Sequence, residues 1–472
     1  MDTPQETKPK KMKNTLIAAV AIIVVIIIVG SVVALDYNNL VKAPTTSASS
    51  QEIFVYAGPS GTNNSEHLLG GDVLGMAAGA NQTGQYAMAQ FMAYMMSPAV
   101  QQEYMVKTGF LPVSNSAYTS SPSSNVTSIY SKSNASVSIT YYDDITPADA
   151  GFVKGIISNF EGTYTNIHVS YVNTVATSIL SAVEADVTSA NGQNIVVSID
   201  NLDIGSLVYG HYMQNINTLA AKINPSGTIQ SITNLTNYET TVFHGIFFLT
   251  ERANIPLVWI NYSAMTKAGI KSAPTTNAQL LADAQTLYKY YGTGMINFQG
   301  HGGASTATEL YQWFVQDGGN PMVFNSSADI HSMEFIYNLS KYFSPEYKTS
   351  YWATYKGLAS NKYSMMDYQW PGSVNLTALG MKAYNSSDTA TNASLQAMTS
   401  GVFLRTPVPW IGEWQTLMDN AWTSIIVNGG NYTSIPSVLS SENSAMYNYL
   451  LTSYNYTVAQ QYASGYYQPI VG

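Results

Sequence analysis

Acidic side chains end two apolar segments of the sequence, and these are the residues whose chemistry is most informative. Asp143 ends the segment VSITYYD and Asp144 follows it, and Asp200 ends the segment NIVVSID. Neighbouring carboxylates could be the acid and base of a glycoside hydrolase, but adjacent residues of a strand point to opposite faces, so adjacency alone makes no catalytic pair. Carboxylates also accept hydroxyl groups through strong, charge-assisted hydrogen bonds. The pattern therefore favours ligand binding over catalysis.

Other features of the sequence also argue against an enzyme. No Ser-His-Asp order, HExxH, P-loop or GxSxG motif is evident, and cysteine is absent, so neither thiol chemistry nor disulfides are available. We expect no catalytic residue, no metal and no cofactor. The net charge of -9 argues against a nucleic-acid partner, which would require a basic surface.

The composition suggests an external and acidic environment. Charged residues form only 10% of the chain, far below the usual quarter. An acidic medium would explain this deficit, because carboxylates lose their charge there and ion pairs lose one partner. Optimal activity near neutrality, with collapse below about pH 4, would exclude the idea. Asn-X-Ser/Thr sequons recur along the chain and suit a glycosylated extracellular surface.

Strands and helices alternate from residue 137 onward, which indicates how the acidic residues are positioned. VSITYYD is followed by the helical pattern ADAGFVKGIISNF, the strand IHVSYV, the helical pattern ATSILSAVEADVTSA and the strand NIVVSID. Short apolar strands separated by helices predict βαβ units around a mainly parallel sheet. Ligands of such sheets bind at the carboxyl ends of the strands, where Asp144 and Asp200 stand.

The N-terminus carries an uncharged apolar run, residues 16–35. At about 1.5 Å per residue, it is long enough to cross a hydrocarbon layer of about 30 Å. Lysines precede it and Asp36 follows it, so the positive-inside rule places residues 1–15 in the cytoplasm and the body of the chain outside. A cleaved signal peptide is the alternative. We expect a single-pass anchor in the cell membrane and a polar linker over residues 36–51.

Several longer segments resemble a known family. YYDDITPADAGFVKGIISNFEGTYTNIHVSYVN, INFQGHGGASTATELYQWFVQDGGN, YSMMDYQWP and RTPVPWIGEW, in this order and spacing, resemble the extracellular solute-binding proteins (family 1) of carbohydrate ABC importers, especially archaeal trehalose/maltose-type binders. The resemblance covers most of residues 137–472. It implies a two-lobed α/β fold of the class II periplasmic-binding-protein type, here preceded by one transmembrane helix. It also implies two kinds of partner, a glucose-containing di- or oligosaccharide and ABC permease subunits.

Residues 53–112 resemble a family block that normally follows the MMDYQWP motif but here comes first. In the family this block belongs to the N-terminal lobe, so its transposition would make each lobe contiguous. We expect an N-terminal lobe over residues 52–245 and a C-terminal lobe over residues 246–472, joined by one crossing near Phe243 to Phe248. The alternative is an unrelated helix in an added domain, which would leave residues 53–58 outside the main sheet.

The resemblance also implies a set of ligand-binding residues. Asp200 matches the family aspartate that accepts two sugar hydroxyls, with a helix cap as the alternative, and Asp144 is suited to either role. Trp370 matches the stacking aromatic, with a core position as the alternative. Arg405 and Trp410 match an arginine and aromatic pair of the C-terminal lobe.

Four further candidates have weaker support. Glu251 lies where the family places polar contacts, although a surface ion pair is equally consistent with its neighbours. Gly71 would bring backbone close to the ligand, and Asp72 replaces a tryptophan that the relatives place after the two glycines. His301 could donate to a hydroxyl, although an isolated histidine is more often structural.

Together these features predict a membrane-anchored extracellular protein, not an enzyme, that captures a di- or oligosaccharide for import. A structural surface glycoprotein of the S-layer or adhesin kind, with no role in transport, is the alternative. The anchor and the sequons suit both functions, but only the first explains the ordered sugar-binding motifs.

Overall fold

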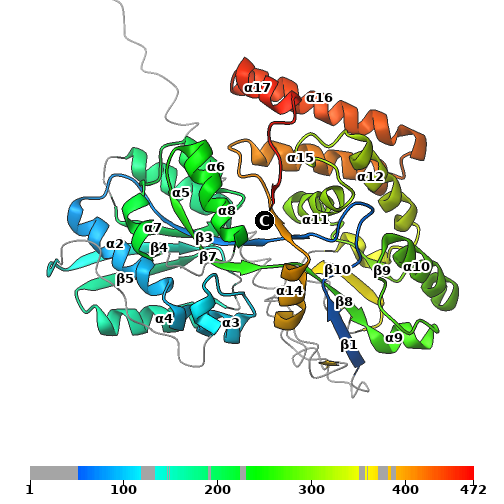
Figure 1. The fold of residues 1–472 in the computed structure, drawn as a ribbon, viewed down its shortest axis with the longest axis horizontal. Coiled ribbons are helices and arrows are strands. Elements are labelled where there is room, and N and C mark those ends of the chain that lie inside the picture. Colours follow the sequence, from blue (N-terminus) through cyan, green and yellow to red (C-terminus); the bar gives the residue numbers. More distant parts are fainter. Residues whose placement is uncertain are drawn as a thin grey trace, which may run out of the picture.

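The computed structural model describes residues 51–118, 133–145, 147, 149–189, 193–223, 230–349, 357, 358, 360–369, 381–383 and 390–471. They form two lobes side by side, each built on a five-stranded sheet with helices around it (Figure 1). The expected membrane segment, residues 16–35, lies outside the described residues. Within them, no helix has both the length and the apolar character needed to cross a bilayer.

The first lobe contains a mostly parallel sheet. Its strand order is β5 (Ile167–Asn173), β4 (Val137–Asp143), β6 (Ile195–Asp200), β3 (Gly70–Met76) and β7 (Phe248–Asn254). β4 pairs in parallel with both β5 and β6, whereas β3 is antiparallel to both of its neighbours. The predicted parallel arrangement of β4, β5 and β6 is therefore confirmed.

The central strand β6 shows why this sequence forms a buried sheet. Ile195, Val197 and Ile199 pack into one apolar cluster, whereas Val196 between them packs into another. Successive side chains of a strand point to opposite faces, so helices cover both sides of β6 and its apolar run is nearly continuous. The helices of this lobe are α2 (Gln82–Met95), α3 (Pro98–Thr108), α4 (Ala150–Thr163), α5 (Ala176–Thr188), α6 (Ile204–Tyr209), α7 (Asn217–Ile223) and α8 (Gln230–Tyr238).

The second lobe is built on a mixed sheet and a larger set of helices. Its strand order is β11 (Met381–Ala383), β1 (Gln51–Tyr56), β8 (Leu257–Asn261), β10 (Met365–Gln369) and β9 (Ile296–Asn297). Its helices are α9 (Tyr262–Lys267), α10 (Asn277–Tyr291), α11 (Gly303–Gln316), α12 (Ser327–Ser340), α14 (Ala390–Thr399), α15 (Ile411–Trp422), α16 (Ile435–Ser453) and α17 (Tyr456–Ala463). Trp313, Trp410, Trp414 and Trp422 fill its core, since each is at most 1% exposed.

The helix ends of the second lobe follow local signals in the sequence. At the start of α12, Ser326 and Asp329 form a reciprocal capping box. α10 begins after Thr276, whose side chain accepts from the backbone of Gln279, and ends at Gly292 in the left-handed conformation. These caps satisfy backbone groups that the helices themselves leave unpaired.

A three-stranded sheet connects the lobes. β12 (Val402–Leu404) lies between β13 (Ile470–Val471) and β2 (His67–Leu68), and the chain ends near the middle of the molecule (Figure 1). One apolar cluster also extends across the junction, because Ile53 and Trp259 of the second sheet belong with Val73 and Ile199 of the first. The lobes therefore share packing as well as strands.

The path of the chain differs from the contiguous lobes that we expected. β1 pairs with β8 and β11 in the second sheet, although it begins the block assigned to the first lobe. β7 pairs with β3 in the first sheet, although it follows the expected boundary at residue 245. The early block thus supplies both sheets and forms no separate domain, so the described chain passes between the sheets twice, from β1 to β3 and from β7 to β8. Its transposition stays a prediction.

Candidate functional site

A cavity of about 240 Å³ lies between the two lobes. Asp144 follows β4 and Asp200 ends β6, so the first lobe contributes the carboxyl ends of its strands, as the parallel sheet predicts. Across the cavity, Gln299 follows β9, Thr308 lies on α11 and Arg405 follows β12. The described lining is Asp144, Ala176, Asp200, Leu202, Asp203, Pro256, Gln299, Ala304, Ser305, Thr308, Glu309, Gln312, Arg405 and Gln415.

An ion pair between Asp200 and Arg405 bridges the cavity. Nη2 of Arg405 donates to both carboxylate oxygens of Asp200, at 2.6 and 2.9 Å, and Nη1 donates to Oγ1 of Thr308 at 3.1 Å. Oδ1 of Asp200 also accepts from the backbone of Leu202 in the turn before α6, but the N-cap of that helix is Asp203, so Asp200 is not the helix cap of the alternative. Asp200 is therefore both a local turn residue and the first lobe's contact with the second.

Three polar atoms at the cavity have no hydrogen-bond partner in the described part of the chain. They are Oδ1 of Asp144, Nε2 of Gln299 and Nε of Arg405. Gln299 and Arg405 are each 4% exposed, and a buried polar atom without a partner costs about 1–3 kcal/mol. Nε2 of Gln299 and Nε of Arg405 are hydrogen-bond donors, and Oδ1 of Asp144 is an acceptor. This combination suits a ligand with hydroxyl groups, because a hydroxyl can both donate and accept.

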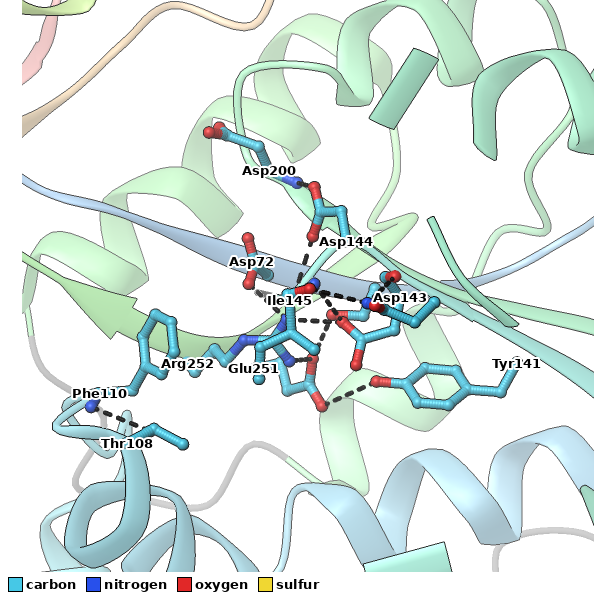
Figure 2. Close-up of polar contacts among 12 residues, drawn as sticks. Asp72, Thr108, Phe110, Tyr141, Asp143, Asp144, Ile145, Asp200, Glu251 and Arg252 are labelled. Atoms are coloured by element: carbon cyan, nitrogen blue, oxygen red, sulfur yellow. Dashed lines mark hydrogen bonds and ion pairs between the residues drawn. The ribbon is translucent and has the colours of Figure 1, made fainter. Parts of the chain in front are cut away.

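Behind the cavity, carboxylates converge on the buried guanidinium of Arg252 (Figure 2). Arg252 lies 2.5 Å from Asp72, 2.7 Å from Asp143 and 2.8 Å from Glu251, and its side chain is 1% exposed. Asp144 lies at 4.0 Å and links this cluster to the cavity, because its Oδ2 accepts from the backbone of Asp200. One arginine thus faces four carboxyl groups, more negative charge than it can neutralise.

Four carboxyl groups of this region have a raised pKa. Burial raises the pKa of Asp72 to about 6 and that of Glu251 to about 7, against the opposing charge of Arg252. Burial, and then the charge of Asp72, raises the pKa of Asp144 well above its usual value. Burial and the charge of Asp200 raise the pKa of Asp203 to about 7. The walls of the cavity therefore change charge between acidic and neutral pH.

Of the residues singled out from the sequence, Asp144, Asp200 and Arg405 are brought together at the cavity. Asp72 and Glu251 lie behind it, and Glu251 is 0% exposed and bonded to Ser198 and Arg252, so its ion pair is buried rather than on the surface. Trp370 lies outside the described residues.

The remaining candidates have other roles in the structure. A Cβ on Gly71 would stand 2.1 Å from the carbonyl oxygen of Arg252, so its close approach is to β7 rather than to a ligand. Trp410 is 1% exposed and packs edge-on against Tyr462 and Tyr467, which makes it a core residue. His301 is exposed, lies 3.2 Å from the carbonyl of Lys348 and does not line the cavity.

The sequence reading missed the polar face of α11. Ser305, Thr308, Glu309 and Gln312 all line the cavity, and steps of three and four residues put them on one side of a helix. This spacing was visible in the segment GGASTATELYQWF, where only the nearby histidine was singled out. A polar stripe on an otherwise apolar helix was the signal that could have identified them.

More than half of the chain matches the model of a known protein family. Residues 142–401 match the model of the family described as bacterial extracellular solute-binding protein, whereas no curated protein matches the chain. The GacH receptor of Streptomyces glaucescens is 13% identical, with 68% of this chain and 100% of that chain covered and a TM-score of 0.49. Maltose-bound MalE3 of T. maritima is 11% identical, with 66% and 100% covered and a TM-score of 0.48.

Proposed function

The chain belongs to the family of bacterial extracellular solute-binding proteins, and we propose that it captures a sugar between its lobes for delivery to an ABC permease. Each lobe contributes part of the cavity, so closure of the lobes around a ligand would complete the site. Residues 16–35 would hold this binding domain at the outer face of the cell membrane. The function is binding rather than catalysis.

The observation that carries the proposal is the set of polar atoms at the cavity that have no hydrogen-bond partner among the described residues. Oδ1 of Asp144 comes from the first lobe, and Nε2 of Gln299 and Nε of Arg405 come from the second. A hydroxylated ligand would satisfy all three groups at once and would thereby bind the two lobes to each other. Trp370 remains our candidate for an aromatic face inside the cleft.

The ion pair between Asp200 and Arg405 has a defined place in this proposal. The two charges satisfy one another across the cavity. Asp200 is 36% exposed, so a ligand hydroxyl can reach its carboxylate while Arg405 stays bonded to Thr308. We therefore propose Asp144, Asp200, Gln299, Thr308 and Arg405 as the ligand contacts.

Thermal unfolding with a panel of sugars tests the function. A ligand at about 100 times its dissociation constant adds roughly 2.7 kcal/mol of stability, so a binder is expected to raise the unfolding midpoint. The panel comprises glucose, maltose, trehalose, longer glucans, pentoses and peptides. If every compound leaves the midpoint unchanged, the proposal fails and the structural surface glycoprotein becomes the better explanation.

A pair of glutamine variants tests the position of the site. Gln299→Ala is expected to reduce the ligand-induced shift, because it removes an unpaired donor at the cavity. Gln90→Ala is the matched control, since Gln90 is also buried with an unpaired Nε2 but does not line the cavity. Equal ligand responses in the two variants would show that the site is misplaced.

A further inference from the structure

A second hollow, of about 340 Å³, lies along the same seam between the lobes. We call it the seam groove. Its first-lobe wall comes from α5 and from the end of α6 with the turn after it, and its second-lobe wall comes from Pro409 and Tyr454. In Figure 1, α5 and α6 lie on the side of the first lobe that faces α15. The full lining is Leu180, Glu184, Ser206, Leu207, Tyr209, Gly210, Tyr212, Pro409 and Tyr454.

The seam groove adjoins the cleft cavity. On α5, Ala176 lines the cavity and Leu180 lines the groove, which are one helical turn apart, about 6 Å. On the opposite side, Arg405 lines the cavity, and Pro409 lies four residues further along the same segment. The two walls of the groove are in contact through a hydrogen bond of 3.3 Å from the hydroxyl of Ser206 to the carbonyl of Pro409 and through the packing of α6 on that segment.

The groove supplies aromatic faces that the cavity does not. None of the described residues that line the cavity is aromatic, whereas three tyrosines line the groove. Tyr209 is 50% exposed and Tyr454 is 37% exposed, and they stand on opposite lobes. Small-molecule sites combine aromatic faces with a few polar groups, and here the described polar groups and aromatic faces are divided between the two hollows.

Tyr209 and Tyr212 are each oriented by contacts with their surroundings. Tyr209 packs edge-on against Phe243 with ring centres 5.8 Å apart, and the hydroxyl of Tyr212 donates to Glu184 at 3.0 Å. Gly210 is required beneath the ring of Tyr212, because a Cβ there would lie 2.2 Å from it. A face held in place before binding loses little conformational freedom when a ligand stacks on it.

We propose that the seam groove binds further units of an oligosaccharide whose first units occupy the cleft. This rests on the proposed function, and it makes the ligand an oligosaccharide longer than the cleft alone can hold. The cleft cavity is smaller than the roughly 300–1,000 Å³ typical of small-molecule sites, and the groove brings the combined space into that range. The tyrosines would stack on the apolar faces of the outer sugar rings.

Binding of saccharides of increasing length tests this inference on the full chain. Isothermal titration would use α-1,4-glucans, β-1,4-glucans and β-1,4-xylans of one to seven units. We expect affinity to rise beyond the length that fills the cleft, and Tyr209→Ala and Tyr454→Ala each to weaken binding of the longest bound saccharide about tenfold, which corresponds to about 1.4 kcal/mol. Binding of the shortest bound saccharide should not change.

The controls separate stacking from folding. Tyr209→Phe keeps the ring and should bind the long saccharide as the unmodified protein does. Tyr290→Ala makes the same truncation at a tyrosine that is 56% exposed on α10, outside both hollows, and should have no effect.

Each outcome decides the inference. If saccharides bind but affinity does not depend on length, or if Tyr209→Ala and Tyr454→Ala behave as Tyr290→Ala does, the groove is not part of the site and the proposed function stands. If no saccharide of any series binds the unmodified protein, the inference falls, and the proposed function falls with it if the sugar panel also leaves the unfolding midpoint unchanged.

Discussion

Glu239 offers the sharpest test of how burial controls the stability of this protein. Its side chain is 1% exposed, and its Oε2 accepts from the backbone N–H groups of Phe247 and Phe248 at 2.7 and 3.1 Å. These two hydrogen bonds favour the charged form, but burial outweighs them and raises the pKa of Glu239 from 4.5 to about 8. The folded protein therefore holds a proton here that the unfolded chain releases near pH 4.5.

The sign of the effect follows from linkage. A carboxyl group whose pKa is raised by folding contributes stability that is complete below about pH 4.5 and is lost as the pH rises through about 8. A pKa difference of one unit corresponds to about 1.4 kcal/mol, so the contribution of Glu239 to the free energy of unfolding falls by about 5 kcal/mol between pH 4 and pH 9. Glu239→Gln removes the titrating group but keeps a carbonyl oxygen for both backbone donors. We expect the variant to gain stability relative to the unmodified protein as the pH rises.

Urea unfolding, followed by tryptophan fluorescence at pH 4.5, 6, 7.5 and 9, measures this difference. Glu161→Gln is the matched control, because Glu161 also accepts from a backbone N–H, that of Val169 at 2.8 Å, but is partly open to solvent. The control should follow the unmodified protein at every pH. Parallel stability curves for Glu239→Gln and the unmodified protein would refute the reasoning.

Three further predictions concern other buried or bridging groups. Asp200→Asn removes the charge that pairs with Arg405, so the ligand-free protein should become more open, seen as an increased radius of gyration in small-angle scattering. Arg252→Met leaves the surrounding carboxylates without their cation and should cost about 3–5 kcal/mol at pH 7 in urea unfolding, with a smaller cost at pH 4. Trp410→Ala should cost about 3–5 kcal/mol through core packing, and titration of the folded variant should show unchanged affinity for a bound sugar.

The pKa shifts of the buried carboxyl groups favour stability at acidic pH, which is consistent with the acidic medium suggested by the composition. Asp72, Asp203 and Glu251, like Glu239, have pKa values raised mainly by burial, to between about 6 and 8. Each contributes stability at acidic pH that is lost toward neutrality. Maximal stability on the acidic side of neutrality is therefore expected, and stability that rises steadily from pH 4 to pH 8 would contradict it.

The strands with polar ends could be predicted because their signals are local. β4, β5 and β6 each carry a short apolar run, and the helices between them force a parallel arrangement. Parallel strands bring their carboxyl ends to one edge, so the sequence predicts that Asp144 and Asp200 lie near each other. Arg405 was found through the family resemblance of its segment, not through any local pattern.

Other features could not be predicted because they depend on pairings distant in the sequence. β1 contains an apolar pattern that suits either sheet, and only its pairing with β8, about 200 residues later, places it in the second lobe. A tryptophan suits either a ligand-stacking position or the core, so the residue type of Trp410 could not tell the two roles apart. Its place in the core depends on its contacts with Tyr462 and Tyr467, which lie about 50 residues later in the chain. The block order therefore did not predict the lobe that holds β1.

The position of acidic residues at the ends of parallel strands could be predicted from the amino-acid order, because strand periodicity and handedness are properties of short segments. Which of those residues meet the opposite lobe depends on the packing of the two lobes. Asp200 reaches Arg405 across the cavity, whereas Asp143 and Glu251 turn inward to Arg252. The reason is that each ion pair depends on how strands from distant parts of the chain pack together, and local sequence patterns do not specify that packing.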